Sequence, residues 1–137
     1  MIIIVCVDDD WGMTFNNRRQ SRDRNLRERI LEITDGSRLW MNHYSAKQFC
    51  SDNAPQINID ENFLSEALLG EYCFVENVDV IPYAKWVEKV IVYKWNRKYP
   101  ADQFFSFPLK EHNWRLIQAT EFTGYSHEKI TEEIYFK

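Results

Sequence analysis

The sequence predicts a three-layer α/β domain, in which helices flank a mixed central sheet and an antiparallel hairpin closes the sheet at the C-terminus. Three observations predict it. The chain has 137 residues, of which 45% are hydrophobic, so we expect one domain over residues 1–137. Strand-like and helix-like segments alternate through the first two-thirds of the chain. The last part holds strand-like segments with no helical pattern between them.

The first strand is predicted by the run Ile2–Val7, which consists mainly of β-branched residues. Because no polar residue interrupts the run, it is typical of a central strand covered on both faces. A polar loop is expected to follow it. Ser21 is then a reasonable N-cap for a helix in which Leu26 and Ile30 recur at helical spacing, and Gly36 ends that helix.

The remaining elements alternate before the chain becomes all strand. Further strands are expected at residues 37–41, 56–59, 72–75, 87–95, 114–122 and 128–136. Helical segments are expected at residues 45–51, 61–69 and 82–86, the second beginning at Asp60 as N-cap and ending at Gly70. Thr123 and Gly124 separate the last two strands, which predicts the closing hairpin.

Arginine is unevenly distributed along the chain. Residues 18–29 contain six of the nine arginines and two acidic residues, a local charge of +4, whereas the other residues sum to −8. Guanidinium groups bind phosphate and carboxylate oxygens in pairs, so this segment is a candidate for binding a nucleotide phosphate, an anionic substrate, RNA or a protein partner. The alternative is a solvated helix face whose arginines pair with carboxylates of an otherwise acidic domain.

Several classes of protein are disfavoured. The sequence contains no P-loop and no G-x-G-x-x-G, G-x-S-x-G, H-E-x-x-H or C-x-x-C motif. His43, His112 and His127 lie far apart in the sequence, so no metal site is predicted, and the His-x-His-x-Asp-His set of a metal-dependent ribonuclease is absent.

The cysteines and the apolar runs bear on location. Cys6 and Cys73 each lie in an apolar run, which is typical of buried free thiols in a reducing compartment. The longest apolar stretch, residues 1–7, is too short to span a membrane. We therefore expect a cytoplasmic protein with no membrane partner.

Short motifs occur in the order found in a known enzyme family. They are Gly12-Met13 and Asn16-Asn17 in the loop after the first strand, Asp23 at the opening of the helix, Met41 followed by Asn42-His43-Tyr44-Ser45 where the family has Met-Gly-Arg-x-Thr, and, near the end, Asp102 before Phe104-Phe105, Trp114-Arg115-Leu116 and Tyr135-Phe136-Lys137. In these matches, which span nearly the whole chain, the sequence resembles dihydrofolate reductase.

The resemblance implies an oxidoreductase that passes a hydride from NADPH to a pteridine. It assigns Asp23 as the catalytic carboxylate that holds the pteridine and assists its protonation. Substrate contacts are then expected from the segments that match the family's substrate loop and later strand, namely Trp11, Met13, Arg18, Arg19, Arg22 and Tyr93. The alternative for Asp23 is that it compensates the dipole of the helix N-terminus and pairs with neighbouring arginines.

The expected cofactor site departs from the family pattern. By resemblance, NADPH would lie against His43, Ser45, Glu76 and Asn77. Glu76-Asn77 stands where the family has a Gly-Gly pair, and His43 stands where it has an arginine. A carboxylate beside the cofactor phosphates is repulsive, so weakened or altered use of NADPH is expected.

Two classes of function follow. The first is a divergent reductase that acts on a pteridine or a similar flat heterocycle. The second is a non-catalytic relative, which binds a nucleotide-like ligand in the cleft or an RNA or protein partner through residues 18–29. No metal is implied by either.

Overall fold

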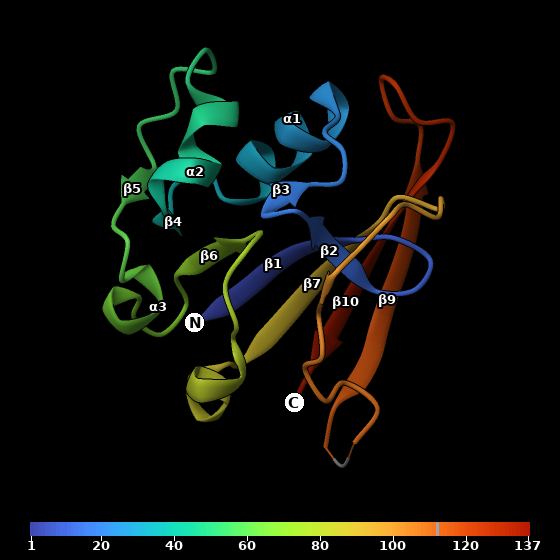
Figure 1. Cartoon of the computed structure of the whole chain (residues 1–137). Coiled ribbons are helices and arrows are strands. Elements are labelled where there is room, and N and C mark those ends of the chain that lie inside the picture. The colour runs from blue at the N-terminus through green and yellow to red at the C-terminus, as the bar shows by residue number, and fades with distance from the viewer. Residues whose placement is uncertain (112) are drawn as a thin grey trace.

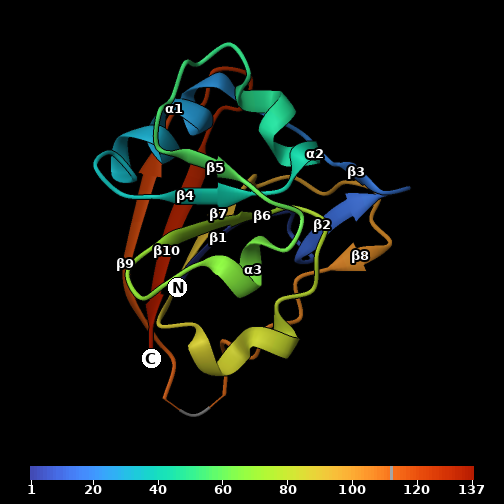
Figure 2. The ribbon, with the colours of Figure 1, turned by 90° about the vertical axis from the view of Figure 1, so that its left-hand side faces the viewer.

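The computed structural model describes residues 1–111 and 113–137, so His112 lies outside the described residues. Figures 1 and 2 show a twisted sheet with helices packed on it and a small second sheet beside the end of β1. Both chain ends lie at the same end of the large sheet, opposite the helix α1 (Arg24–Ile33) in Figure 1. In the described part of the chain, no helix is long and apolar enough to cross a membrane.

The large sheet has seven strands in the order β5-β4-β6-β1-β7-β10-β9 within the described residues. Their bounds are β1 (Ile2–Val7), β4 (Leu39–Met41), β5 (Ile57–Ile59), β6 (Tyr72–Val75), β7 (Lys89–Lys94), β9 (Arg115–Phe122) and β10 (Ile130–Phe136). The first five strands run parallel, and β10 is antiparallel to both β7 and β9. The predicted mixed sheet with a C-terminal antiparallel hairpin is confirmed.

Strand β1 is buried on both faces, as its uninterrupted apolar run predicts. Ile3 and Val5 face one core, with Met13, Phe63 and Phe105. Ile2 and Ile4, which alternate with them along β1, face a second core on the opposite side of the sheet. That core also contains residues of α1, β4 and the 3₁₀ turn at residues 47–49: Leu26, Ile30, Leu39, Met41 and Phe49. The sheet is therefore the middle of three layers.

The remaining helical segments are short. They are α2 (His43–Ala46), the 3₁₀ turn η1 (Lys47–Phe49), α3 (Phe63–Glu66) and the 3₁₀ turn η2 (Ile81–Trp86). Segment α3 is much shorter than the helix expected over residues 61–69, because the backbone of Ala67 is extended. Its Phe63 and Leu64 are buried, so packing rather than helical propensity holds this single turn.

The expected polar loop after β1 contains two strands instead. Strand β2 (Gly12–Phe15) pairs with β3 (Arg18–Arg19) and with the distant β8 (Gln103–Phe104), giving a three-stranded sheet. The pairing of Gly12 with Phe104 joins segments far apart in the chain, which local composition does not reveal.

The first helix begins two residues later than predicted. Asp23 rather than Ser21 is its N-cap, since the Asp23 backbone is extended and its carboxylate accepts from the amides of Asn25 and Leu26. Ser21 is thereby left in the segment that leads into the helix, with its hydroxyl free to serve another contact.

Candidate functional site

A small cavity lies at the carboxyl ends of the parallel strands, where ligands bind in open α/β sheets. Its volume is about 10 Å³, near the minimum for one water molecule. The lining residues come from β1, β2, β3, β6 and the residues that directly follow β3, β6 and β7: Cys6, Met13, Arg19, Gln20, Ser21, Val75, Glu76 and Trp95. Three of the expected site residues, Met13, Arg19 and Glu76, therefore meet around one space.

The cavity is small because a buried ion pair fills the space beside it. Arg19 donates from Nε and Nη2 to the two carboxylate oxygens of Glu76, at 2.8 and 3.1 Å. The Tyr44 ring lies 4.4 Å from the Arg19 guanidinium carbon, and its hydroxyl accepts from the Arg19 amide at 2.8 Å. Glu76 is thus neutralised within the chain, and Arg19 is held by Glu76, which follows β6, and by Tyr44 of α2.

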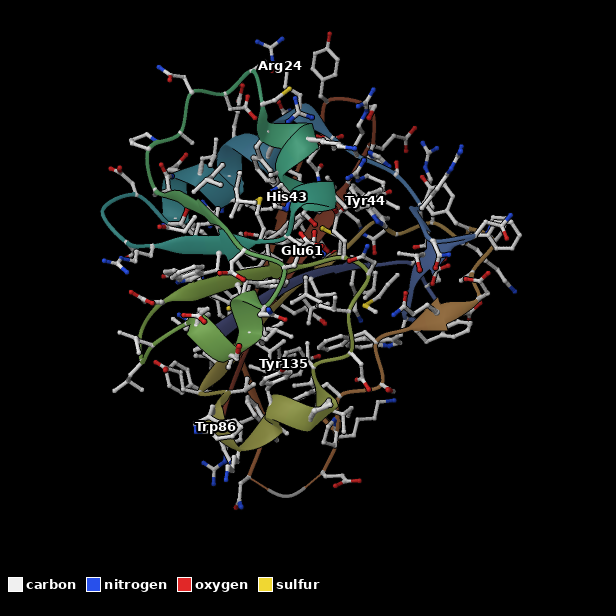
Figure 3. The ribbon with its side chains drawn as sticks, turned by 60° about the vertical axis from the view of Figure 1, so that its left-hand side comes forward. Arg24, His43, Tyr44, Glu61, Trp86 and Tyr135 are labelled. Carbon is white, nitrogen blue, oxygen red and sulfur yellow. The ribbon has the colours of Figure 1, made fainter. Side chains whose placement is uncertain are left out.

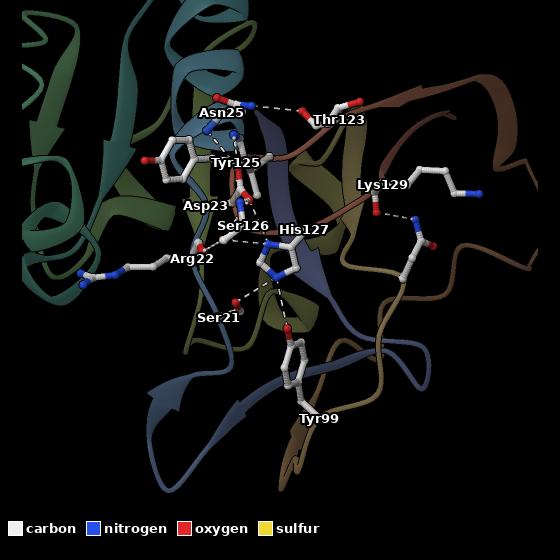
Figure 4. Close-up of polar contacts among 12 residues, drawn as sticks. Ser21, Arg22, Asp23, Asn25, Tyr99, Thr123, Tyr125, Ser126, His127 and Lys129 are labelled. Atoms are coloured by element: carbon white, nitrogen blue, oxygen red, sulfur yellow. Dashed lines mark hydrogen bonds and ion pairs between the residues drawn. The ribbon is translucent and has the colours of Figure 1, made fainter.

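Asp23 lies next to this cavity but does not line it. Its carboxylate accepts from the amides of Asn25, Leu26, Tyr125 and Ser126 at 2.9 to 3.2 Å. The Ser126 hydroxyl at 3.2 Å and the His127 ring at 2.9 Å complete the set (Figure 4). Two carboxylate oxygens offer about four acceptor positions, so this carboxylate is fully occupied by its own chain.

Those contacts keep Asp23 ionised. Burial by itself would raise the pKa of Asp23, but the hydrogen bonds from the Tyr125 amide, the His127 ring and the Ser126 and Leu26 amides outweigh it and hold the pKa well below its ordinary value of 3.8. The charge lies at the N-terminal end of α1, where the helix dipole favours it. The alternative for Asp23 is a structural role at the helix N-terminus with arginine partners. Asp23 does cap the helix, but its side-chain partner is His127 rather than an arginine.

His127 is held on all sides. Its Nδ1 lies 2.9 Å from Asp23 Oδ2, and its ring stacks on Trp95 with centroids 4.6 Å apart. Its Nε2 lies 3.1 Å from the hydroxyls of both Ser21 and Tyr99. Only 5% of the residue is exposed.

Gly124 makes this approach possible. A Cβ placed on Gly124 would lie 2.7 Å from Asp23 Oδ2 and 2.7 Å from the His127 carbonyl oxygen. Real Cβ atoms essentially never come this close to other heavy atoms. The turn residue between β9 and β10 is therefore glycine because the helix cap and the hairpin loop touch there.

Asp8, at the end of β1, organises the opposite side of the site. Its carboxylate accepts from the Gly12 amide at 2.7 Å, the Gln20 side chain at 3.0 Å and the Tyr99 amide at 3.2 Å. Burial would raise the pKa of Asp8, but these hydrogen bonds and one from the Asp10 amide lower it. Asp8 thus holds Tyr99 and also Gln20, which precedes Ser21, and the hydroxyls of Ser21 and Tyr99 both contact His127.

The other residues expected to contact a substrate are dispersed. Tyr93 is fully buried on the α1 side of the sheet, where its hydroxyl donates to Glu132 at 2.8 Å. Trp11 packs against the other core, with the Lys94 ammonium 5.1 Å from its ring centroid. Arg18 lines an open hollow of about 510 Å³ with Tyr99, and Arg22 is exposed.

Of the residues expected at the cofactor, all but Ser45 have side chains paired with other residues of the chain. His43 is exposed and its Nδ1 lies 2.8 Å from Glu61, a pair visible in Figure 3. The Asn77 side-chain oxygen accepts from the Asn42 amide group at 2.9 Å. Ser45 is buried, and its hydroxyl has no hydrogen-bond partner among the described residues.

The arginine-rich segment is largely paired inside the chain. Arg19 pairs with Glu76, Arg24 with Glu28, Arg27 with Asp52, and Arg29 with Glu132. Among the described residues, Arg18 and Arg22 form no ion pair. These pairs favour the interpretation of a solvated face over a nucleic-acid surface.

Metal ligands do not gather in the described part of the chain, where no three His, Cys, Asp or Glu side chains could hold one ion. A larger hollow of about 800 Å³ lies at the other end of the large sheet, near Met1, Trp86 and Phe136. It contains none of the residues that the sequence pattern associates with chemistry.

Comparisons with known proteins identify the fold. No protein-family model matches the chain, and no curated protein matches it. A solved structure of dihydrofolate reductase from Enterococcus faecalis, complexed with NADP(H) and RAB-propyl, superposes with a TM-score of 0.70 at 11% sequence identity, covering 98% of this chain and 94% of that chain. The expectation of a dihydrofolate reductase-like fold is thereby confirmed.

Proposed function

We propose that the protein is a divergent reductase of the dihydrofolate reductase type, which binds a small flat heterocycle of the pteridine or nucleotide-like class and uses NADPH weakly. The observation that carries this proposal is the cavity at the carboxyl ends of β1, β6 and β7. Its walls combine the flat Trp95 ring and the apolar Met13 with the polar groups of Arg19 and Ser21. Apolar walls with a few polar groups are typical of small-ligand sites.

Arg19 would control access to this site. A heterocyclic ring is much larger than the space present, so the ligand must displace the Arg19 side chain from Glu76. The freed guanidinium would then be available to an anionic group of the ligand. Asp23 would act on the ligand through His127 and Ser21, since Ser21 lines the cavity and Asp23 does not.

The fit to NADPH is poor. The solved neighbour binds NADP(H), and the unpartnered Ser45 hydroxyl on α2 is the kind of group that a phosphate oxygen would satisfy. However, the Glu76–Arg19 pair and the Asn42–Asn77 hydrogen bond occupy the position where the family pattern has two glycines. Residues 76 and 77 therefore do not fit a dinucleotide pyrophosphate in the arrangement seen, and no chemical step is assigned to the cofactor.

Ligand titrations test the proposal. Folate, dihydrofolate and NADPH are titrated separately against the wild-type chain, with quenching of tryptophan fluorescence and calorimetry as readouts, and NADPH oxidation is followed with dihydrofolate present. We expect saturable binding of the heterocycles, binding of NADPH at least about tenfold weaker, and slow turnover. Absence of saturable binding of both heterocycles would overturn the proposal, and NADPH binding as tight as theirs would overturn its cofactor part.

A pair of variants tests the access argument. Arg19→Ala combined with Glu76→Gly removes both partners of the ion pair and is expected to strengthen NADPH binding by about tenfold, or ~1.4 kcal/mol. Arg97→Ala, which changes an exposed arginine near the same end of the sheet, is the matched control and should leave binding unchanged. Equal affinities for NADPH in the wild type, the double variant and Arg97→Ala would mean that the ion pair does not close the site.

A further inference from the structure

Ser21, His127 and Asp23 form a linear chain of polar contacts, which the reductase proposal uses only to connect Asp23 with the ligand. Ser21 Oγ lies 3.1 Å from His127 Nε2, and His127 Nδ1 lies 2.9 Å from Asp23 Oδ2 (Figure 4). A nucleophile bonded to one ring nitrogen and a carboxylate bonded to the other is the arrangement that activates serine in acyl-transfer enzymes, which occurs on unrelated folds.

The carboxylate fixes the tautomer of the histidine. An ionised carboxylate only accepts hydrogen bonds, so Nδ1 of His127 carries a proton toward Asp23. In the neutral ring Nε2 then presents its lone pair to the two hydroxyls. The ring cannot turn away, because it is buried and stacked on Trp95. His127 is therefore oriented as a base toward Ser21.

Two hydroxyls share this one acceptor. Nε2 of a neutral imidazole accepts one hydrogen bond, yet both Ser21 Oγ and Tyr99 Oη lie 3.1 Å from it. While Ser21 donates to Nε2, the Tyr99 O–H is free to donate elsewhere. Because both hydroxyls lie next to the same nitrogen, the Tyr99 O–H is the donor available to negative charge that develops on a group bound to Ser21.

Access and charge suit a small anionic substrate. Ser21 is partly exposed, whereas His127 and Asp23 are buried. Tyr99 lines the open hollow of about 510 Å³, and Arg19 and Gln20 line both this hollow and the cavity that Ser21 lines. Arg18 also lines the hollow, and it forms no ion pair with a described residue. A carboxylate on the substrate would be attracted to it.

We propose that Ser21 is the nucleophile of a hydrolytic site that cleaves esters of small carboxylic acids carrying a second, anionic group. Ser21 Oγ bonds to the carbonyl carbon while its proton passes to His127 Nε2, and Tyr99 donates to the resulting oxyanion. When the carbon–oxygen bond to the leaving group breaks, His127 returns the proton to the departing oxygen. Water then attacks the acyl-serine ester by the same route, which releases the acid and restores the Ser21 hydroxyl. Asp23 is a positioning residue, because it touches only the histidine.

Hydrolysis of two p-nitrophenyl esters tests this proposal on the full chain. The probes are neutral p-nitrophenyl acetate and the mono-p-nitrophenyl ester of succinic acid, which carries a free carboxylate. We expect hydrolysis above the buffer rate with a preference for the anionic ester, and Arg18→Gln should remove the preference. Ser21→Ala should lower kcat/KM by at least about 100-fold. Ser51→Ala, at an exposed serine away from the site, is the matched control and should match wild type.

Covalent labelling gives a readout that does not depend on a variant's folding. A fluorophosphonate should modify the wild-type protein, and the adduct should map by mass spectrometry to the peptide that contains Ser21. His127→Gln should abolish the adduct, and its circular dichroism spectrum establishes that it is folded. Hydrolysis at the buffer rate with no adduct at Ser21 in the wild-type chain would overturn the proposal, as would undiminished hydrolysis by Ser21→Ala. Neither assay uses NADPH, so a negative result here leaves the reductase proposal standing. Likewise, a failure to bind folates or NADPH leaves the hydrolytic proposal standing.

Discussion

Asp23 and His127 lie 104 positions apart in the sequence, and their side chains meet with 2.9 Å between Oδ2 and Nδ1. The contact joins the N-cap of α1 to the loop between β9 and β10. Because the same carboxylate also accepts from the Tyr125 and Ser126 amides, it fastens the N-terminal end of the helix to the hairpin. The Asn25 side chain adds one further hydrogen bond, to the Thr123 carbonyl oxygen. The structural role of Asp23 and the chemical role proposed for it therefore depend on the same contacts, and the structural part can be measured by itself.

Asp23→Asn is expected to destabilise the fold by about 2–3 kcal/mol. The oxygen of an asparagine can still cap the helix. Its NH₂ group, however, would replace Oδ2, which accepts from the Ser126 amide, and two donors would then face each other. Urea unfolding followed by tryptophan fluorescence measures the loss. Asp35→Asn, at an exposed position just after α1, is the matched control and should stay within about 0.5 kcal/mol of wild type. A loss equally small for Asp23→Asn would show that the hydrogen-bond set contributes little.

Stability is expected to fall on acidification below about pH 4. Hydrogen bonds overcome the effect of burial at Asp23 and at Asp8 and hold both pKa values below the ordinary 3.8. Above that value both carboxylates are ionised in the folded and unfolded chain, and their stabilisation is complete. As the pH falls through it, the unfolded chain takes up protons first, so the free energy of unfolding decreases.

Urea midpoints measured between pH 7 and pH 3 check this dependence. The Asp23→Asn variant lacks one of the carboxyl groups whose pKa is lowered in the folded chain, so its midpoint should change less over the same range. Parallel curves for the two proteins would show that the protonation of Asp23 is not linked to folding.

The sequence was sufficient for the large sheet but not for the site. The apolar run of β1 and the Thr123-Gly124 turn are local signals, and both elements form where they were predicted. His127 had no such signal. Its relation to Asp23 depends on the β10–β9 pairing and on the position of α1, which are long-range contacts. Nothing in its sequence neighbourhood distinguishes it from a surface histidine.

The sequence also leaves open whether the arginines of residues 18–29 bind an anionic partner or pair with carboxylates of the same chain. Arg19 lies close to Glu76 only because β3 folds back over the end of β6, and β3 itself was predicted as loop. The charge of Glu76 is therefore neutralised by Arg19, and the expected repulsion of a cofactor phosphate is reduced. What stands in the way of a cofactor is instead the volume that the ion pair occupies. A count of charges along the chain cannot distinguish these two cases.

Gly124→Ala should destabilise the protein by about 1–3 kcal/mol. The added methyl group would have to displace either the Asp23 carboxylate or the His127 backbone, each 2.7 Å away, from a well-packed position. Thr123→Ala, an exposed change in the same turn, serves as the control. Thermal unfolding of both variants, together with the chemical shifts of the His127 ring, distinguishes a local displacement from a general loss of structure. Unchanged melting of Gly124→Ala would mean that the loop has room to move.

A second buried network connects α1 to the sheet and gives the last prediction. Arg29 donates from Nε and Nη2 to the two carboxylate oxygens of Glu132 at 2.9 and 3.0 Å, and the Tyr93 hydroxyl donates to the same carboxylate at 2.8 Å. Glu132 is 2% exposed. Burial would raise the pKa of Glu132, but the hydrogen bonds from Arg29 and Tyr93 lower it, so the group stays ionised. Removing Arg29 or Tyr93 leaves the buried Glu132 carboxylate without one of its partners, whereas Arg29 itself is partly exposed.

Glu132→Gln is accordingly expected to cost about 2–4 kcal/mol, and Tyr93→Phe about 1 kcal/mol. A double-mutant cycle in urea unfolding measures their coupling, which should reach about 1 kcal/mol because both changes remove the same hydrogen bond. Glu133→Gln, on the opposite face of β10, is the matched control: Glu133 pairs with Lys94 and accepts from the Tyr135 hydroxyl, which a glutamine oxygen can still do, so the change should cost less than about 1 kcal/mol. Purely additive losses at residues 93 and 132 would show that the tyrosine hydroxyl contributes nothing to holding the carboxylate.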